Sequence, residues 1–378
     1  MALVIERAAL QTSLNLVQGI VERRTTVPIL GHVLLEPNGN SLALSATDLE
    51  VGIRTQVGCE GKEKSLTLNA RKLFEIVREA SSEEVNVTSL DNDWVEIKCG
   101  RAKFKMMGLD PRSFPAMPSQ STREGAAPGK KSLKAELTIP ALVLAEMIDK
   151  TLFAVSPDEA RYNLNGVYIE AAGPKAARMV ATDGHRLAMV EREVADFQME
   201  GGAIIPRKGV GELRKILDSS GEGEVKLSLE GQLAYMKRGS TEVSMRLVEG
   251  EFPDYRGVIP KSSKYKIAVD RDGLFAAIRR AAIFSNERYH GVKFSLAPGL
   301  LTVSSTSPET GEASESIDVD FKGEEFSIGF NSSYVQQALG VVPSGAEVEF
   351  GLSDDVSPGV MHTPSDSKYT YVVMPMRL

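Results

Sequence analysis

The chain has 378 residues, with 44 Lys and Arg against 51 Asp and Glu, so its formal net charge is −7. Apolar residues make up 42% of it, which excludes disorder over most of the length because there is enough apolar surface to form cores. No apolar run approaches the ~20 residues that span a bilayer, and the N-terminal segment lacks a signal-peptide pattern. The two cysteines, Cys59 and Cys99, have no metal-binding spacing and cannot form a disulfide framework, which favours a reducing cytoplasm.

An internal repeat is the strongest signal in the sequence. Four landmarks recur in one order at spacings of 135 to 138 residues: Gly31 and Gly166, Asp48 and Asp183, Arg71 and Arg207, and Phe114 and Phe252. A fainter third copy begins at Gly291. One third of the chain is 126 residues, an ordinary size for a domain. The sequence therefore predicts three related domains.

The first repeat, residues 1–120, is predicted to contain a helix, strands, a second helix and further strands. Apolar residues at helical spacing mark the first helix, namely Leu10, Leu14, Val17 and Val21. The later elements are a strand over Leu42–Thr47, a helix over Leu73–Ala80, and strands over Trp94–Cys99 and Lys103–Met106. The stretch Pro118–Lys134, rich in Ser, Gly, Pro and Lys, is typical of a surface linker.

The second and third repeats, residues 135–258 and 264–378, follow the same order, and Val258–Tyr265 is predicted to be a second linker. Their first helices carry the stripes Leu144, Met147, Ile148 and Leu152, and Leu274, Ala277, Ile278 and Ala281, with Thr138 as a candidate cap of the former. The other elements are strands over Ala177–Thr182, Val243–Leu247 and Val292–Leu296 and helices over Val210–Leu217 and Tyr334–Leu339. Two helices among about eight short antiparallel strands make each repeat an α+β domain.

The predicted helices are basic although the chain is acidic overall. Segments 70–80, 206–218 and 270–280 together hold ten basic and six acidic residues. This segregation suits one surface that faces phosphate groups while the rest of the protein repels them. The alternative is that these are ordinary solvated helix faces. No base-reading motif accompanies the charge, so nucleic-acid binding is expected to lack sequence preference.

The most enzyme-like string is Ala181–Arg186 (ATDGHR), because Asp183 and His185 stand two residues apart. The equivalent string of the first repeat keeps Thr47 and Asp48 but has no histidine, so we interpret Thr-Asp as a strand-ending turn in which Asp bonds its own backbone. His185 then serves either a binding site or a structural role. No metal-ligand cluster, phosphate-binding loop or serine nucleophile elbow is present, so we expect no metal, no cofactor and no enzyme.

Over its whole length the sequence resembles the bacterial sliding-clamp family, the beta subunits of DNA polymerase III. The motifs that carry this resemblance are Thr26–Gly31 (TVPILG), Ala46–Glu50 (ATDLE), Arg161–Gly166 (RYNLNG), Ala181–Leu187 (ATDGHRL), Ile205–Gly209 (IPRKG), Phe252–Tyr255 (FPDY), Ser285–Arg288 (SNER), Gly329–Asn331 (GFN) and Tyr371–Leu378 (YVVMPMRL). The resemblance implies three domains of the DNA-clamp fold and a head-to-tail homodimer that closes into a ring around duplex DNA. It implies a DNA polymerase processivity factor without sequence specificity. The implied partners are the replicative DNA polymerase alpha subunit, the clamp loader, and other polymerases and repair proteins that carry clamp-binding motifs.

The resemblance also implies particular site residues. A peptide pocket between the second and third repeats is expected at Leu164, Thr182, Gly184, His185, Arg186, Leu187, Pro253, Val258, Asn331, Tyr334, Val372, Val373, Met374, Pro375, Met376, Arg377 and Leu378. DNA contacts are expected at Arg24, Arg71, Tyr162 and Lys208, and a dimer interface at Lys103, Phe104, Met106, Ile283 and Phe284. Lys103 and Lys105 are expected to meet acids near Glu312 and Glu315.

Alternatives remain at several of these positions. Phe104 and Phe284 can instead pack inside their own domains, and Tyr162 can pack locally with Arg161. Gly257 and Pro358 replace residues that are familiar elsewhere in the family, so the peptide preference of this chain is expected to differ. A clamp-like paralogue with another role is a further alternative, against which the intact Thr182–Leu187 and Val372–Leu378 segments count.

Overall fold

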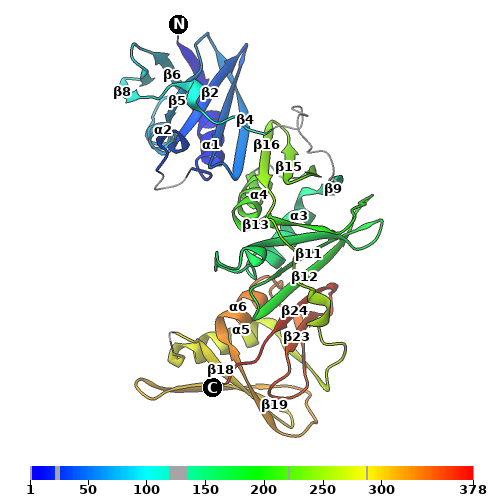
Figure 1. The fold of residues 1–378 in the computed structure, drawn as a ribbon. Coiled ribbons are helices and arrows are strands. Elements are labelled where there is room, and N and C mark those ends of the chain that lie inside the picture. The colour runs from blue at the N-terminus through cyan, green and yellow to red at the C-terminus, as the bar shows by residue number, and fades with distance from the viewer. Residues whose placement is uncertain (1, 22–25, 119–133, 220–221, 287, 378) are drawn as a thin grey trace. The chain divides into compact units, whose positions relative to one another are not determined.

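The computed structural model describes the whole chain except residues 1, 22–25, 119–133, 220–221, 287 and 378 (Figure 1). Within the described residues, one order of elements occurs three times: strand, helix, four strands, helix, three strands. Each copy thus has two α-helices and eight strands, which confirms the predicted α+β repeat. The first predicted linker falls almost entirely outside the described residues. None of the described helices is both long and apolar enough to cross a membrane.

The elements of the first repeat are β1 (Leu3–Glu6), α1 (Arg7–Val17), β2 (His32–Asn38), β3 (Ser41–Thr47), β4 (Val51–Glu60), β5 (Leu66–Asn69), α2 (Ala70–Glu79), β6 (Glu84–Ser89), β7 (Trp94–Cys99) and β8 (Ala102–Met107). Those of the second are β9 (Lys134–Pro140), α3 (Ala141–Leu152), β10 (Gly166–Ala171), β11 (Ala176–Thr182), β12 (Arg186–Glu193), β13 (Gly202–Pro206), α4 (Arg207–Ser219), β14 (Glu224–Glu230), β15 (Leu233–Arg238) and β16 (Thr241–Arg246). Those of the third are β17 (Tyr265–Asp270), α5 (Arg271–Ala281), β18 (Gly291–Ala297), β19 (Leu300–Ser307), β20 (Gly311–Asp318), β21 (Phe326–Asn331), α6 (Ser332–Gly340), β22 (Glu347–Leu352), β23 (Gly359–Thr363) and β24 (Asp366–Val373).

The chain divides into two compact units, of which the first holds residues 1–144, 196–200 and 208–247. Its 12-stranded antiparallel sheet runs in the order β8-β7-β6-β1-β4-β16-β15-β14-β9, with β2, β3 and β5 attached beside β4. Strand β16 of the second repeat pairs with β4 of the first, with Val243 opposite Ile53. The ladder therefore continues from one repeat into the next, and we call this pairing the first seam.

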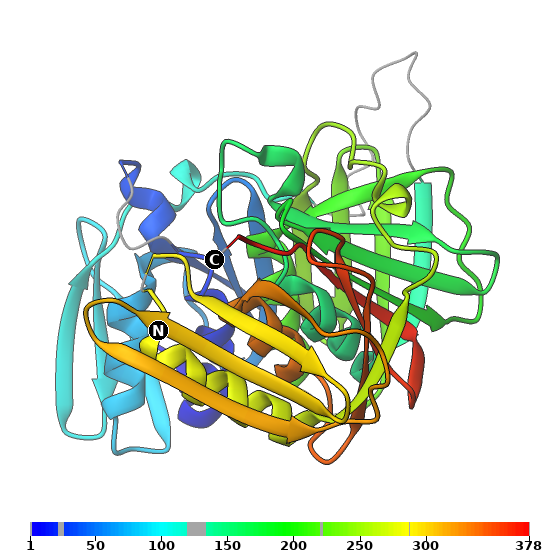
Figure 2. The same ribbon diagram turned by 90° about the horizontal axis from the view of Figure 1, so that it is seen from below.

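The second unit holds residues 145–195, 201–207 and 248–378. It contains an eight-stranded sheet, β13-β10-β11-β12-β24-β23-β22-β17, and a four-stranded sheet, β20-β19-β18-β21, against which α5 packs (Figure 2). Strand β24 of the third repeat pairs with β12 of the second, with Val372 opposite Leu187. We call this pairing the second seam. It is equivalent to the first seam, because β24 corresponds to β16 and β12 corresponds to β4 in the element order of the repeat.

Two strands lack the neighbour that their counterparts have. By element order, β8 corresponds to β16 and β24, and β20 corresponds to β4 and β12. In the described residues, β8 pairs with β7 alone and β20 with β19 alone. Strand β8 of the first repeat and strand β20 of the third repeat are thus left as open edges.

Side-chain caps start three of the six described α-helices, α2, α5 and α6. The Asp270 carboxylate accepts a hydrogen bond from the backbone N–H of Gly273 at 2.6 Å and caps α5, and Asn331 caps α6 in the same way. The predicted cap at Thr138 is wrong, because Thr138 lies within β9 opposite Lys226. The alternation of buried Ala135, Leu137 and Ile139 keeps the chain in a strand up to Pro140. Helix α1 likewise ends at Val17, although Val21 beyond it is buried.

Candidate peptide and nucleic-acid sites

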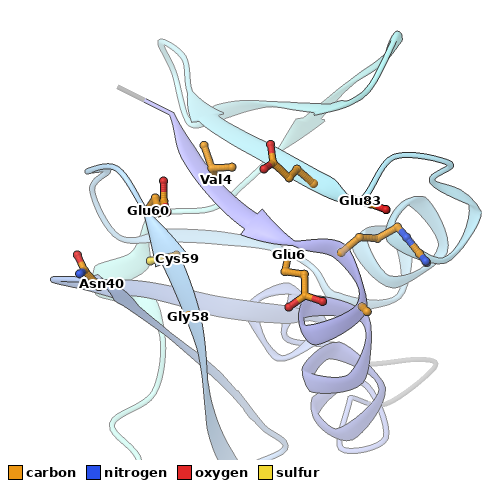
Figure 3. A pocket seen from close by; sticks show the side chains of 10 residues that line it. Val4, Glu6, Asn40, Gly58, Cys59, Glu60 and Glu83 are labelled. Atoms are coloured by element: carbon orange, nitrogen blue, oxygen red, sulfur yellow. The ribbon is translucent and has the colours of Figure 1, made fainter.

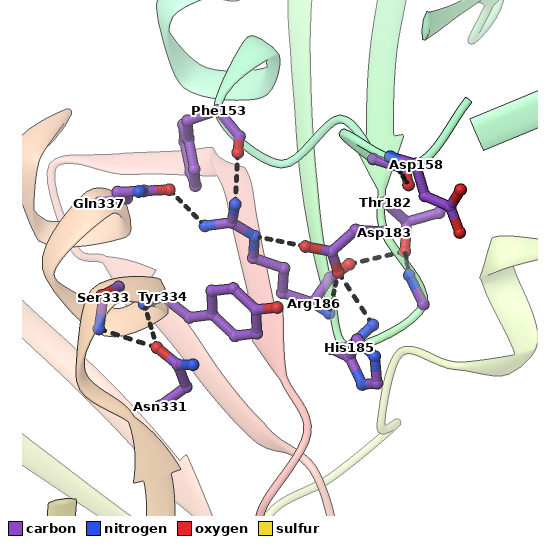
Figure 4. Close-up of polar contacts among 12 residues, drawn as sticks. Phe153, Asp158, Thr182, Asp183, His185, Arg186, Asn331, Ser333, Tyr334 and Gln337 are labelled. Atoms are coloured by element: carbon purple, nitrogen blue, oxygen red, sulfur yellow. Dashed lines mark hydrogen bonds and ion pairs between the residues drawn. The ribbon is translucent and has the colours of Figure 1, made fainter. Parts of the chain in front are cut away.

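A tight turn joins β11 to β12 at the centre of the predicted peptide site (Figure 4). The Asp183 carboxylate accepts backbone hydrogen bonds from His185 at 2.9 Å and from Arg186 at 3.1 Å. The Thr182 hydroxyl donates to the carbonyl oxygen of Arg186 at 2.6 Å. Asp183 is buried and uses its carboxylate for the turn and for Arg186, so it is not free to act as a general base toward a substrate.

The first repeat contains the same turn. Asp48 accepts backbone hydrogen bonds from Glu50 at 2.9 Å and Val51 at 2.7 Å, and the Thr47 hydroxyl donates to the carbonyl oxygen of Val51 at 3.0 Å. The predicted strand-ending turn is therefore confirmed in both repeats. The third turn residue differs, because Gly184 has a φ of +89° where Leu49 holds a φ of +79° without the freedom of glycine.

Arg186 is a buried hub that links the second repeat to the third. Its Nε donates to the Asp183 carboxylate at 3.0 Å, one terminal nitrogen donates to Gln337 Oε1 at 2.6 Å, and the other to the carbonyl oxygen of Phe153 at 2.5 Å. The guanidinium also lies 4.3 Å from the ring centre of Tyr334. Burial, and then the nearby Asp183 carboxylate, raise the pKa of Tyr334. With 7% exposure and these partners, Arg186 supports the site from beneath.

The C-terminal segment after β24 runs along both repeats. The N–H of Met374 donates to the carbonyl oxygen of His185 at 2.8 Å, and the N–H of Met376 donates to that of Gly329 in β21 at 2.9 Å. These bonds hold the segment in extended form beside the turn. The structure thus brings Met374 next to the predicted β11–β12 turn and Met376 next to β21, while Leu378 lies outside the described residues.

The predicted peptide residues fall into an accessible layer and a supporting one. Gly184, His185, Pro253, Val258, Met374 and Arg377 are exposed, and Leu164, Asn331, Tyr334, Pro375 and Met376 are half-buried. Thr182, Arg186, Leu187, Val372 and Val373 are buried. Leu187 and Val372 belong to a closed apolar cluster with Val180 and Tyr255. An incoming peptide can therefore contact the exposed and half-buried residues, whereas contact with the buried ones would require rearrangement of the second seam.

Sequence reasoning missed the polar groups that brace this site. The Tyr255 hydroxyl donates to Glu170 at 2.6 Å, and Arg256 reaches both oxygens of that carboxylate at 2.8 Å. Burial, followed by the hydrogen bond to Glu170, raises the pKa of Tyr255 to about 12. Glu170 and Arg178 alternate with apolar residues in β10 and β11, so nothing local distinguishes them from solvated strand residues. Gly257 ends the short helix that Tyr255 begins, with open space around the position of a Cβ.

Two of the predicted DNA-contact residues meet at the exit of α1. Arg71 donates to the carbonyl oxygen of Val21 at 3.2 Å, and Lys208 donates to that of Ile20 at 3.1 Å. Lys208 also forms an ion pair with Asp48 and keeps a side-chain exposure of 35%. Tyr162 is 61% exposed, and Arg24 lies outside the described residues.

The basic excess of the helices is partly neutralised by local ion pairs. Lys72 pairs with Glu75 at 2.8 Å on α2, and Lys215 pairs with Glu212 at 2.7 Å on α4. Arg280 at the end of α5 binds both oxygens of Glu315 in β20. These local pairs fit the ordinary solvated-face interpretation for Lys72, Lys215 and Arg280.

The predicted dimer residues lie on or beside the two open edges. Phe104 and Met106 occupy β8 on the side of buried Ile97 and Val95, yet Phe104 is 37% exposed. Ile283 is 73% exposed, and a Cβ on Gly311 would lie 3.2 Å from the ring of Phe284. At the two internal seams a neighbouring strand pairs with the equivalent positions, whereas no described strand pairs with the open edges beside these apolar groups.

A hollow of about 840 Å³ in the first unit holds none of the predicted residues (Figure 3). It is lined by Val4, Glu6, Arg7, Ala8, Asn40, Gly58, Cys59, Glu60, Glu83 and Glu84. Four carboxylates against one guanidinium make this surface unsuited to phosphate groups.

Comparison with known proteins agrees with these features. Three family models match in order: the DNA polymerase III beta subunit N-terminal domain over residues 1–118, its central domain over 138–254 and its C-terminal domain over 256–377. The beta sliding clamps of Caulobacter vibrioides and Pseudomonas aeruginosa are 36% and 37% identical to this chain, each over 100% of both chains.

Solved structures show the same likeness. A Caulobacter crescentus beta sliding clamp with bound polyethylene glycol gives a TM-score of 0.90 at 36% identity, covering 100% of this chain and 99% of that one. A Pseudomonas aeruginosa sliding clamp bound to griselimycin gives 0.90 at 36% identity, covering 100% of both. With all three domain models matched in sequence and the threefold element order observed in the structure, this chain belongs to the DNA polymerase III beta subunit family, the bacterial beta sliding clamps.

Proposed function

We propose that this chain is a processivity clamp: two copies close head to tail around duplex DNA and tether a DNA polymerase to it. The family consists of non-catalytic processivity factors, in keeping with the use of Asp183 as a turn and framework residue. The observation that carries the proposal is the pair of equivalent seams together with the two open edges, β8 and β20. An edge of each kind on every chain is what a head-to-tail contact needs.

The two internal seams supply a register for this contact. Ser244 lies opposite Gly52 in the first seam, and Val372 lies opposite Leu187 in the second. The hairpins identify the equivalent positions on the two open edges. Thr306 faces Glu312 as Thr47 faces Gly52, so Glu312 on β20 is the counterpart of Gly52 on β4. The β7–β8 turn matches the β15–β16 turn, so Lys105 on β8 is the counterpart of Ser244 on β16. We therefore propose that Lys105 faces Glu312 of the partner subunit.

The same register proposes the apolar centre of the interface. Phe104 faces Ala313 of the partner subunit, and Met106 faces Gly311 of the partner subunit. Within each chain, Phe284 lies beside Gly311, so this ring belongs to the same apolar centre. Lys103 borders this centre, and Ile283 extends it. Glu315 is held by Arg280 of its own chain, whereas Glu312 has no ion pair with another described residue, so we propose that Glu312 attracts the lysines of β8.

The proposed peptide site takes a short, largely apolar segment of the polymerase alpha subunit, the clamp loader or a repair protein. Exposed Val258 and Met374 offer apolar contact, His185 offers a polar edge, and flexible Met side chains adapt to different sequences. Deletion of Met374–Leu378 should abolish polymerase capture, measured by pull-down, while the dimer persists in sedimentation. Unchanged capture would refute this site.

DNA passes through the ring on the proposed contacts Arg24, Arg71, Tyr162 and Lys208, without sequence preference. We propose that the protein is cytoplasmic, because its two cysteines are free thiols, as expected in a reducing compartment. The decisive test is retention after loading on nicked circular DNA compared with linear DNA of the same length. A ring stays on the circle and slides off the line, whereas a groove binder stays on both to the same extent.

A further inference from the structure

The aspartate of the Thr-Asp turn holds a cation in both repeats, but the two cations differ in exposure. In the second repeat, the Asp183 carboxylate accepts a hydrogen bond from Arg186 Nε at 3.0 Å, and that arginine is 7% exposed. In the first repeat, Asp48 forms an ion pair with Lys208 in the first turn of α4, and the lysine side chain is 35% exposed. The same turn therefore holds a framework cation at the second seam and a solvent-accessible cation at the first.

Asp48 is fixed in place, and its lysine is not. One carboxylate oxygen of Asp48 accepts backbone hydrogen bonds from Glu50 at 2.9 Å and Val51 at 2.7 Å, and the other faces Lys208 Nζ. The Asp48 side chain is 6% exposed. Lys208 also donates to the carbonyl oxygen of Ile20 at 3.1 Å. A buried carboxylate tied to the backbone cannot follow the lysine outward, so Lys208 has to loosen this ion pair to reach a phosphate group.

We propose that Asp48 restrains Lys208 and thereby lowers the affinity of the protein for DNA, because its carboxylate competes with a DNA phosphate for the ammonium group. This inference rests on the proposed function, since it takes duplex DNA as the polyanion that Lys208 meets. An acid beside a lysine repels the phosphate that the lysine attracts, so the pair adds less to binding than a lysine with neutral partners. A weak phosphate contact suits a protein that slides along DNA.

Arg71 on α2 provides a comparison within the same compact unit. It donates to the carbonyl oxygen of Val21 at 3.2 Å, which is a neutral partner, whereas the partner of Lys208 is a carboxylate. A hydrogen bond to a neutral oxygen leaves the charge of the guanidinium uncompensated. Arg71 should therefore contribute more to the salt-dependent part of DNA binding than Lys208 does.

The test measures the affinity of the full-length dimer for a short linear duplex at several salt concentrations, by fluorescence anisotropy. Asp48→Asn keeps an oxygen for the turn and removes the charge. It should strengthen binding about threefold to tenfold and steepen the slope of log K against log salt by up to about one. Adding Lys208→Ala should abolish this gain. Damage to the fold would weaken binding instead, so the direction of the change separates restraint from a merely structural role.

The matched control is Glu136→Gln, which removes one acid from the ion pair with Lys226 on the paired strands β9 and β14. If Asp48→Asn binds the duplex no more tightly than this control, the proposed restraint is wrong.

A second measurement decides the matter if Asp48→Asn does not fold. Lys208→Ala, in an otherwise wild-type chain, should reduce the salt slope by less than Arg71→Ala does, and equal reductions would overturn the restraint. The proposed function is judged separately by retention of the wild-type protein on circular DNA. Failure of that retention overturns the clamp itself, whereas a retained wild type with Asp48→Asn equal to the control overturns only the role of Asp48.

Discussion

The two seams of this chain share a backbone pattern and differ in their side chains. At the first seam, hydroxyl groups meet, with Thr55 and Thr241 3.0 Å apart. At the second seam, β12 and β24 are flanked by the Arg186 hub on one side and by a compact ion cluster on the other. The ladder alone is therefore enough to join repeats. At the second seam this additional chemistry surrounds the residues of the proposed peptide site.

The ion cluster joins α3, β12 and the β23–β24 turn. Arg192 reaches Glu146 at 2.7 Å and Asp366 at 2.6 Å, and Lys150 reaches the same two acids at 2.6 Å and 2.5 Å. Burial alone would raise the pKa of the Asp366 carboxyl, but the hydrogen bonds and charges of Arg192 and Lys150 together outweigh it and lower that pKa. These four charges connect the second repeat to the third at the end of the seam away from the turn.

The largest effect is expected from Arg186→Ala. Removal of the guanidinium leaves the buried Asp183 carboxylate without its charge partner, which costs about 3–5 kcal/mol of unfolding free energy. The corresponding change at the first seam, Lys208→Ala, removes a cation that is 35% exposed from an Asp48 carboxylate that is 6% exposed, and it should cost less, about 1–3 kcal/mol. Urea unfolding at one fixed protein concentration measures both. Equal losses would mean that the two seams do not differ as described.

The next effect concerns pH. The folded-state pKa values of Glu146 and Asp366 are lowered, so their contribution is present above the unfolded-state pKa values and is lost as pH falls through the folded-state values. Stability should therefore decline as pH falls below about 4. Asp366→Asn should lose about 1–3 kcal/mol at neutral pH and show a shallower acid decline, measured by unfolding at a series of pH values. A decline as steep as that of the wild type would contradict the role of this carboxylate.

A smaller effect sharpens the comparison between the internal seams and the proposed intermolecular one. Lys105→Glu places like charges opposite each other at both contacts of the dimer, which should weaken dimerisation about tenfold. Glu312→Lys should do the same, and the double variant should recover wild-type association because the charges are exchanged. Sedimentation at several concentrations measures this. A double variant no better than the singles would refute the proposed register.

The smallest effect compares the two turns. Leu49→Gly should relieve the positive φ and change stability by less than about 1 kcal/mol, because the added freedom of the unfolded chain offsets part of the gain. Gly184→Ala should cost about 1 kcal/mol, since alanine disfavours a φ of +89°. Thermal unfolding of both variants beside the wild type measures the two changes. A gain in stability from Gly184→Ala would show that this turn does not depend on glycine.

Much of the fold was predictable because its signals are local. The predicted stripe from Leu274 to Ala281 lies within α5, and the Thr-Asp string gives the turn in two repeats. The error at Thr138 arose because strand β9 runs through this residue to Pro140 and α3 begins directly after it at Ala141.

The Arg186 hub was not predictable in the same way. Its partners Phe153 and Gln337 lie 33 and 151 residues away, and no local pattern signals such a meeting. The resemblance to a family nominated Arg186 as a site residue, but only the paired strands β12 and β24 explain why its charge is used internally. The ion cluster around Arg192 and Asp366 was not predicted for the same reason, because its members are far apart in the sequence.

The open edges β8 and β20 carry a consequence for assembly. Complementary edges on one chain can add further chains without end and form filaments. In a two-chain ring, however, the second junction forms within an existing complex, so its effective concentration is set by geometry and not by the amount of protein. Dilution then favours closed rings over longer polymers, and a lone opened junction finds its own partner again before it meets another chain.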